Sequence, residues 1–465
     1  FALTGYFLNF NYNYQLIGPN GIVLSIDKNS LPLIFGSGVV LLLTFLLRKE
    51  FFSHYFFQIC LVLFSALSIS FLSKDLISLY IALELTGFCA FLLVADKNDH
   101  KSLFNSFQYL IGGGLAMLIY LIGVIQAFTY TGTFLLDDLI NAPSTSLCLI
   151  AAGLLTKAGV FLCGVWVPNI YGYSNTQSAA ILSGCVTCAA IAPLSRLSNI
   201  LEPISNSLII IGVLSGILGA IIALLETDQG RILGWSSVSQ LGIAILSPTY
   251  GCLYAMQHGI CKTILFLTLN KSESSSNIYK NSNIKDISKS ENLREIISIF
   301  SFIIAGLSIS GFPFLTGYIT KGLIKNDLPN EVLLIFNSSA LLTSVVYIKL
   351  IFLRLKDIDL KYLSSNEFKS IFRNIGKAFS SKSITLLISS LFIVGFSFTN
   401  EKFYTIEKIQ ASILTTFLGA VIYISFIGLV PNKNFTNVRK TIDIIGAPFV
   451  IAAFLLFNLT YLKIL

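Results

Sequence analysis

The chain has 465 residues, of which 54% are hydrophobic and 12% charged, with a net charge of +8 and a mean hydropathy of +0.79. Soluble domains carry about 25% charged residues, so this composition excludes an ordinary soluble protein. Apolar runs of roughly 20 residues recur along the chain, which predicts an all-α multispan membrane protein, because lipid offers the backbone no hydrogen-bonding partner. The basic surplus then indicates cytoplasmic loops rather than nucleic-acid binding.

The chain begins at Phe1, and its first residues resemble the tail of an apolar segment, so we expect N-terminal helices to be missing. The apolar runs predict about 14 crossings. The predicted helices cover residues 31–48, 52–73, 75–95, 104–128, 146–167, 177–197, 207–225, 230–247, 250–270, 293–325, 331–353, 382–398, 410–430 and 441–463.

Residues 293–325 are too long for one straight crossing, and "SGFPFLTGY" interrupts them at Gly311, Pro313 and Gly317. Proline removes a backbone hydrogen bond and clashes one turn back, so we expect one broken crossing. With this count, one membrane face receives most lysines and arginines, as cytoplasmic faces do. The opposite face receives only Lys28, Lys74, Arg196, Lys325, Lys402 and Lys408.

The helix count also predicts an internal repeat. Helices within 52–197 form one group of five, and helices within 207–353 form another, with a broken helix in the second and also in the first. Consecutive groups of odd number run through the membrane in opposite directions, and such inverted repeats with broken helices are typical of transporters. Residues 1–51 hold the N-terminal segment and first helix, and 354–465 a polar linker and C-terminal helices.

Five ionisable residues lie inside apolar helices: Glu84, Lys157, His258, Lys262 and Lys321. Charges at membrane depth are costly unless they pair or face water, and such sets usually serve proton or ion passage. An acid that moves toward and away from a lysine would make it hold and release its proton. Glu84 could instead be a structural partner, the lysines could extend to the interface, and His258 could be an ordinary core residue.

No motif of a soluble catalytic site is present, neither a phosphate-binding loop nor a nucleophile elbow nor a cysteine set for an iron–sulfur cluster. We therefore expect no cofactor and no metal. The cysteines lie in apolar segments and are interpreted as small core residues. They are Cys60, Cys89, Cys148, Cys163, Cys185, Cys188, Cys252 and Cys261.

Five stretches, in this order, resemble the antiporter-like membrane subunits, the family that includes the D and A subunits of Mrp-type multisubunit Na+/H+ antiporters and the proton-translocating subunits of respiratory complex I. They are "KDLISLYIALELTGFCAFLL", "LLTKAGVFLCGVWVP", "DQGRILGWSSVSQLGIAIL", "HGICKTILFL" and "SGFPFLTGYITKG". The resemblance runs from about residue 52 to 353.

The resemblance implies a hydrated axis of charges at mid-membrane height. Glu84 and Lys157 would form the acid–lysine pair of the first half-channel, His258 and Lys262 would connect at the centre, and Lys321 would be the exit of the second half-channel. Ser236, Ser237 and Gln240 in "SSVSQLG" would line the route or pack beside it.

The chain departs from the family pattern at three places. Leu162 and Gly164 stand where the family usually has a proline and a histidine, and Cys188 stands where the next helix often carries a lysine. The loop after "VWVP" also lacks the usual charged residues. A thiol cannot replace a cation, so the connection from the first half-channel to the centre is expected to differ.

Four functions remain open. The favoured one is a proton-translocating, D-type membrane subunit of an Mrp-like monovalent cation/proton antiporter, and the first alternative is a proton-pumping subunit of an NADH- or ferredoxin:quinone oxidoreductase without its own redox centre. A scaffold that has lost conduction and a carbon-uptake or hydrogenase-linked subunit are the others. The expected partners are other membrane subunits, lipid, protons and Na+ or K+, in a plasma, inner or thylakoid membrane.

Overall fold

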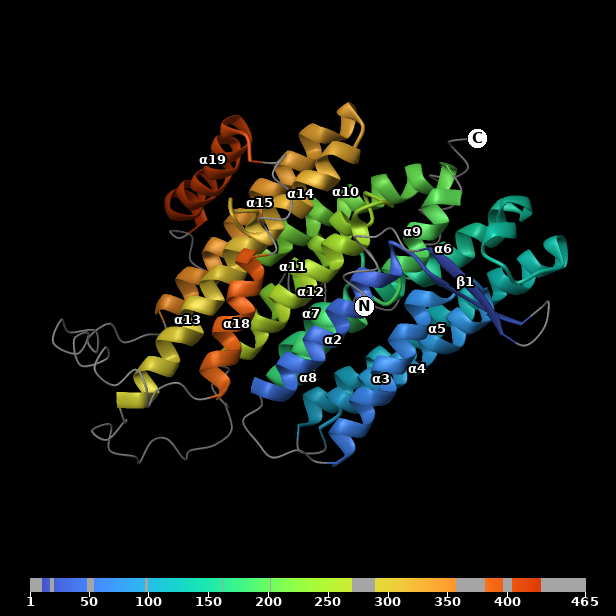
Figure 1. Ribbon diagram of the computed structural model, residues 1–465, viewed down its shortest axis with the longest axis horizontal. Coiled ribbons are helices and arrows are strands. Elements are labelled where there is room, and N and C mark those ends of the chain that lie inside the picture. The colour runs from blue at the N-terminus through green and yellow to red at the C-terminus, as the bar shows by residue number, and fades with distance from the viewer. Residues whose placement is uncertain are drawn as a thin grey trace.

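The computed structural model describes residues 11–16, 21–47, 54–96, 99–161, 163–200, 202–269, 289–356, 381–395 and 404–427. Eight of the helices in these ranges are long and apolar enough to cross a membrane, and Figure 1 shows them packed as one tilted bundle. The chain is therefore a mostly helical, multi-pass membrane protein.

The helices follow the predicted order. They are α2 (Ser30–Leu47), α3 (His54–Leu72), α4 (Leu76–Val94), α5 (His100–Thr131), α6 (Ser144–Ala158), α7 (Trp166–Tyr173), α8 (Thr176–Ile181), α9 (Ile191–Ile200), α10 (Glu202–Leu225), α11 (Gln229–Ala244), α12 (Gly251–Thr268), α13 (Lys289–Ser310), α14 (Thr316–Asp327), α15 (Asn330–Lys356), α18 (Ser381–Gly395) and α19 (Ile406–Ile422). The helix predicted at 441–463 lies outside the described residues.

A small β-hairpin is the one departure from an all-α fold within the described residues. Strands β1 (Tyr12–Leu16) and β2 (Ile22–Ile26) pair antiparallel and lie across one end of the bundle (Figure 1). Asp75 joins the hairpin to α4, because its carboxylate accepts hydrogen bonds from the Val23 backbone N–H at 3.2 Å and from the Ser78 N–H at 2.6 Å. The second contact caps α4 at its first turn.

The broken helix expected in the first predicted group is the one predicted over 146–167. Helix α6 ends at Ala158, and α7 begins only at Trp166. Gly159 takes a left-handed φ of 65° and ends α6, a conformation that glycine adopts without a Cβ penalty. No proline marks this break, so the apolar pattern alone does not reveal it.

The helix over 177–197 is also irregular. Between α8 and α9 lie a π-helical turn, Leu182–Val186, and a stretch of turns. Such local widening of a helix is frequent at functional sites. Here it faces α12 and α2, which both pack against it.

The second predicted break is confirmed. Helix α13 ends at Ser310 and α14 begins at Thr316, with Gly311 at a φ of 92° and Phe314 at 64° between them. Both φ values lie in the left-handed region. Glycine adopts this conformation without steric cost, whereas phenylalanine is strained in it. Pro313 stands inside this break.

Gly317 fixes how the two halves of this broken helix meet. A Cβ at Gly317 would lie 1.7 Å from the Ser308 carbonyl oxygen, which is backbone and cannot swing away. We expect Gly317→Ala to destabilise the folded chain by about 2 kcal/mol or more, because overpacking against backbone forces the halves apart.

The measurement is thermal unfolding in detergent, with Gly114→Ala as the matched control. Gly114 lies in α5, and a Cβ there would have no neighbour within 4 Å. An unfolding temperature for Gly317→Ala equal to that of Gly114→Ala would contradict the close contact of α13 and α14.

The two predicted groups of helices pack against each other mainly through α11 and α12. Helix α11 packs against α7, and α12 packs against α8 and the π-helical turn. Every residue of α12 except Leu267 is buried, so this helix is the centre of the bundle. Helix α19 lies on the outer flank beside α15, as Figure 1 shows in red and orange.

Candidate functional site

The structure brings Glu84 and Lys157 together. Glu84 lies on α4 and Lys157 on the last turn of α6, and their Oε1 and Nζ atoms are 3.6 Å apart. The Lys157 ammonium also donates to the Leu83 carbonyl oxygen at 3.3 Å. Lys157 is buried, whereas the Glu84 side chain is 36% exposed at the bundle surface. The lysine is thus enclosed by the bundle, while part of the glutamate side chain reaches its surface.

Two glycines make space for the Lys157 ammonium, and sequence reasoning did not identify them. A Cβ at Gly87 would lie 2.9 Å from Lys157 Nζ, and one at Gly113 would lie 3.3 Å from it. Only Gly113 of the "GGG" stretch has this role, because a Cβ at either neighbour meets nothing within 4 Å.

The indole of Trp166 lies between the Lys157 region and the first helix break. Trp166 Nε1 donates to the Thr156 carbonyl oxygen at 3.3 Å, and its ring packs on that of Tyr109 at a centroid distance of 4.8 Å. Trp166 therefore connects the two halves of the first broken helix with α5.

Lys262 lies in the middle of the bundle with no exposed surface. Its ammonium donates to the Leu233 carbonyl oxygen at 2.6 Å and to the Ser236 hydroxyl, and it lies 5.6 Å from the centre of the Tyr347 ring. Ser236 Oγ is in turn 3.2 Å from the Tyr347 hydroxyl. Both hydrogen-bond acceptors lie on α11, and the aromatic ring lies on α15, so Lys262 of α12 contacts two neighbouring helices.

His258 lies one turn before Lys262 on α12, as the spacing of four predicts. It is fully buried, and neither imidazole nitrogen has a hydrogen-bond partner among the described residues. Unpartnered buried nitrogens are costly, which favours water beside the ring.

Two residues of the "SSVSQLG" stretch have structural partners. Ser237 donates to the Leu233 carbonyl oxygen at 3.1 Å. Gln240 accepts from the Tyr254 hydroxyl and donates to Ser239 Oγ at 3.3 Å. Only Ser236 of the three predicted lining residues contacts an ionisable group of the predicted axis within the described residues.

Lys321 lies on α14, one turn beyond the second break. Its ammonium donates to Thr343 Oγ1 at 3.0 Å and to the Ser310 carbonyl oxygen at 3.4 Å. Among the described residues it forms no ion pair, in contrast to Lys157. The side chain crosses the break, where a Cβ at Gly311 would lie 3.3 Å from Lys321 Cδ.

The two departures at Gly164 and Cys188 both fall where the first half meets the centre. A Cβ at Gly164 would lie 2.0 Å from the Gly159 carbonyl oxygen, so the turn itself excludes the larger family residue. Cys188 is buried, and its thiol lies 3.7 Å from the Ala255 carbonyl oxygen on α12, three residues before His258. The Cys188 thiol therefore lies at the contact between this irregular helix and α12.

Thr187 fills the neighbouring space and lies 3.5 Å from the Tyr171 hydroxyl. No hydrogen bond or ion pair between described residues joins Lys157, Lys262 and Lys321 to one another. No group of three His, Cys, Asp or Glu side chains suited to hold a metal occurs in the part of the chain that the structure describes.

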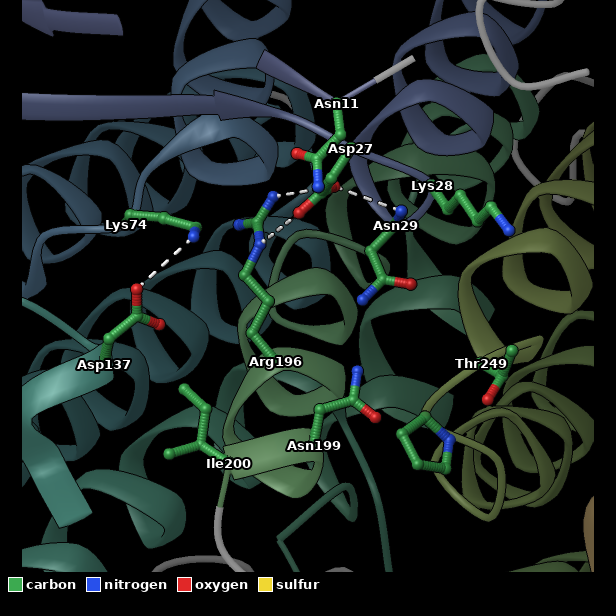
Figure 2. A pocket seen from close by; sticks show the side chains of 11 residues that line it. Asn11, Asp27, Lys28, Asn29, Lys74, Asp137, Arg196, Asn199, Ile200 and Thr249 are labelled. Carbon is green, nitrogen blue, oxygen red and sulfur yellow. Dashed lines mark hydrogen bonds and ion pairs between the residues drawn. The ribbon is translucent and has the colours of Figure 1, made fainter. Parts of the chain in front are cut away.

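A polar cavity at the hairpin end of the bundle was not predicted from the sequence. Its volume is about 350 Å³, and Figure 2 shows Asp27 and Arg196 facing each other in it, with the Lys74–Asp137 pair beside them. The Arg196 guanidinium donates to both Asp27 oxygens at 2.9 and 3.1 Å and to the Phe71 and Ser73 carbonyl oxygens. Arg196 thereby ties α9 to α3 and to the start of α2.

The Asp27–Arg196 pair should make stability depend on pH. Burial alone would raise the pKa of the Asp27 carboxyl, but Arg196 and hydrogen bonds from Ser30 hold this pKa below its ordinary value of 3.8. A lowered pKa gives stability that is present above the unfolded value and is lost as the pH falls through the folded value.

We therefore expect the wild-type unfolding temperature in detergent to fall more steeply below about pH 4 than that of Asp27→Asn. Asp137→Asn is the control, because the Asp137 side chain is 62% exposed and its pair with Lys74 spans 3.4 Å. Such surface pairs contribute little. Parallel curves for wild type and Asp27→Asn would refute the role of this pair.

A further charged cluster lies at the C-terminal end of α10. Arg231 donates to Glu226 Oε1 at 2.7 and 2.9 Å, and the Lys349 ammonium donates to the Leu224 and Glu226 carbonyl oxygens at 2.7 and 2.5 Å. These contacts cap the C-terminus of α10, where cations are stabilised. They brace the bundle outside the predicted axis.

Comparisons with known proteins agree with the fold. Residues 73–346 match the family described as NADH:quinone oxidoreductase/Mrp antiporter, TM. NADH-quinone oxidoreductase subunit N of Desulforudis audaxviator is 28% identical over 271 residues, which cover 53% of each chain. The putative antiporter subunit mnhA2 of Staphylococcus saprophyticus is 26% identical over 367 residues, covering 70% of this chain and 44% of the relative.

Among solved structures, a chain of the Mrp complex from Dietzia sp. DQ12-45-1b superposes with a TM-score of 0.67 and 16% identity, covering 95% of this chain and 91% of that one. The likeness shows the shared fold. The chain spans about half the length, or less, of the curated relatives it matches.

Proposed function

The chain belongs to the NADH:quinone oxidoreductase/Mrp antiporter transmembrane family, and from this premise we propose that it is a proton-translocating membrane subunit of a multisubunit monovalent cation/proton antiporter. One observation carries the proposal: Glu84 and the buried Lys157 form an ion pair at 3.6 Å beside a helix break of a helical membrane protein. An acid–lysine pair at membrane depth is suited to hold and release a proton.

Within this proposal the chain has about 14 crossings, with residues 52–197 and 207–353 as two inverted half-channels. Two observations support this division. Both contain a helix that is broken at a left-handed glycine, Gly159 and Gly311. Each break lies within a few residues of a buried lysine, Lys157 before the first and Lys321 after the second. Residues 1–51 and 354–465 would flank them.

A proton would pass from the Glu84–Lys157 pair to the centre at His258 and Lys262, and from there to Lys321. Ser236 supports the central step, because its hydroxyl accepts a hydrogen bond from the Lys262 ammonium and can donate one to the Tyr347 hydroxyl. Between Lys157 and His258 the proton would have to pass Thr187 and Cys188, whose groups are a hydroxyl and a thiol. Water would have to bridge this interval. The other membrane subunits of the complex would complete the route.

The second candidate is a proton-pumping membrane subunit of a quinone oxidoreductase of the complex I type. The similarity to NADH-quinone oxidoreductase subunit N favours it. The same residues would then respond to redox events elsewhere in the complex, and the chain itself would carry no redox centre.

Proton flux in vesicles that contain the purified complex separates the two. We expect a Na+ or K+ gradient alone to drive proton movement, measured with a pH-sensitive dye, without any electron donor. Flux that needs a quinone and a reductant would support the second candidate. A complex that passes no protons under either condition would refute both.

A further inference from the structure

The first helix break has a backbone N–H that bonds to a different helix. Phe161 lies between α6 and α7, and in an unbroken helix its N–H would donate to the Lys157 carbonyl oxygen one turn back. It donates instead to the Ser215 hydroxyl of α10 at 3.0 Å. Gly159, with its left-handed φ of 65°, turns the chain out of the helical path just before Phe161. A side chain of the second predicted group thus replaces the partner that Phe161 would have in its own helix.

Ser215 is fully buried and extends the connection to a third helix. Its hydroxyl donates to the Val238 carbonyl oxygen of α11 at 2.8 Å. A serine hydroxyl has one proton to donate, so it receives the bond from Phe161 on an oxygen lone pair. Val238 lies two residues after Ser236, which accepts from Lys262. One hydroxyl therefore joins the first break to the helix that holds the central ammonium.

This bonding is not the one that a helical serine adopts by default. A serine inside a helix commonly donates to the carbonyl oxygen three or four residues earlier in the same helix. Ser37, Ser70 and Ser106 do so in this chain. The Ser215 hydroxyl donates to a neighbouring helix, and a glycine makes room for it, because a Cβ at Gly242 of α11 would lie 2.4 Å from Ser215 Cβ. The sequence therefore provides both the hydroxyl and the space for this contact.

The second break has a similar contact, made by Ser308. The Gly317 N–H just after the break donates to the Ser308 hydroxyl at 3.3 Å, and Gln257 Nε2 of α12 donates to the same hydroxyl at 3.1 Å. Ser308 is also fully buried. At both breaks, a buried serine hydroxyl thus accepts a backbone N–H and also bonds to one of the two central helices, α11 or α12.

We propose that Ser215 is a positioning residue, which holds the first break open and couples the position of the break to that of α11. The hold on the break rests on hydrogen bonds alone. The consequence for conduction rests on the proposed function, because it requires Lys157 and Lys262 to carry protons. Without the hydroxyl, the Phe161 N–H loses its partner, and the left-handed Gly159 keeps it from returning to the Lys157 carbonyl oxygen.

Hydrogen–deuterium exchange of the full chain, purified with the subunits that accompany it, tests the hold on the break. Electron-transfer fragmentation of the peptic peptides resolves the Phe161 amide. We expect Ser215→Ala to speed exchange at this amide about tenfold, because the buried donor is left without its acceptor. Ser239→Ala is the matched control. Its hydroxyl is equally buried between α10 and α11 but donates to the Gly216 carbonyl oxygen at 2.7 Å, so exchange at Phe161 should stay at the wild-type rate.

Two glycine variants test the coupling to α11. Gly242→Ala places a Cβ 2.4 Å from Ser215 Cβ and should push α11 away from this hydroxyl. Gly219→Ala also crowds α10 against α11, but its Cβ would meet the Ser239 backbone nitrogen at 2.8 Å. We expect Gly242→Ala alone to speed exchange at Phe161, and to add nothing in a chain that already carries Ser215→Ala. Equal exchange in the two glycine variants would contradict the coupling.

Proton flux per assembled complex in vesicles measures the consequence for conduction. Ser215→Ala should lower it at least about fivefold, because a displaced proton carrier transfers more slowly. Ser239→Ala should leave it near wild type. Ser215→Cys keeps a weak donor and acceptor on the same Cβ, so it should recover part of both the protection and the flux.

Three results would overturn the proposal. The first is equal exchange at Phe161 in wild type and Ser215→Ala, whatever the flux. The second is faster exchange in Ser215→Cys than in Ser215→Ala, which would indicate packing rather than hydrogen bonding. The third is wild-type flux in Ser215→Ala where Lys157→Met abolishes it. A wild-type complex that passes no protons would refute the proposed function instead, and faster exchange in Ser215→Ala would still support the hold on the break.

Discussion

Replacing Lys157 by methionine, or Glu84 by glutamine, is expected to reduce proton flux through the assembled complex at least about tenfold. Their atoms are 3.6 Å apart, and the acid is partly exposed while the lysine is buried. Without Glu84 the ammonium keeps, among the described residues, only the Leu83 carbonyl oxygen as a partner, and without Lys157 the proposed proton carrier beside the break is lost. Flux per assembled complex in vesicles is the measurement.

The matched control is Lys74→Met. Lys74 also pairs with an acid, Asp137, but at the end of the bundle and with both groups solvent-accessible. Such a pair contributes little, so flux and assembly should stay near wild type. Wild-type flux in both Glu84→Gln and Lys157→Met would place the path elsewhere and favour the scaffold interpretation.

Replacing Lys262 by methionine should separate function from stability. Its charge is fully buried and is balanced by a carbonyl oxygen, a hydroxyl and an aromatic face rather than by a carboxylate. Exchange of a buried charge for an apolar side chain of similar volume is often neutral or stabilising. We expect flux to fall at least about tenfold while the unfolding temperature stays equal or rises.

Lys349→Met is the control, and we expect it to affect stability but not flux. Its ammonium caps the C-terminal carbonyl oxygens of α10 and lies outside the proposed path. Its loss should lower the unfolding temperature and leave flux per folded complex near wild type. If Lys262→Met conducts as well as wild type, Lys262 is not a proton carrier.

The sequence predicts those parts of the site that carry a local signal. A charge inside an apolar run is conspicuous, so all five ionisable residues stand out in the sequence alone, and the spacing of His258 and Lys262 places both on one helix face. The second break is equally visible because Gly311 and Pro313 interrupt the run. The roles given to these residues remain predictions.

Other features depend on contacts between distant segments. The Asp27–Arg196 pair joins residues 169 positions apart. Gly87 and Gly113 matter only because Lys157 points at them. A broken helix was expected in the first group, but its position was not, because no proline stands in the break and a single left-handed glycine ends α6. The sequence pattern does not predict the hairpin, because two short strands are stable only when they pack against the end of the bundle.

The indole beside the first break has a practical consequence. The chain contains two tryptophans: Trp166 contacts the carbonyl one residue before Lys157, and Trp235 precedes Ser236, the acceptor of Lys262. Each proposed half of the path thus holds its own intrinsic fluorophore. Trp235→Phe leaves emission from the first half alone, and Trp166→Phe leaves emission from the second, so changes of polarity around either lysine can be followed without an attached dye.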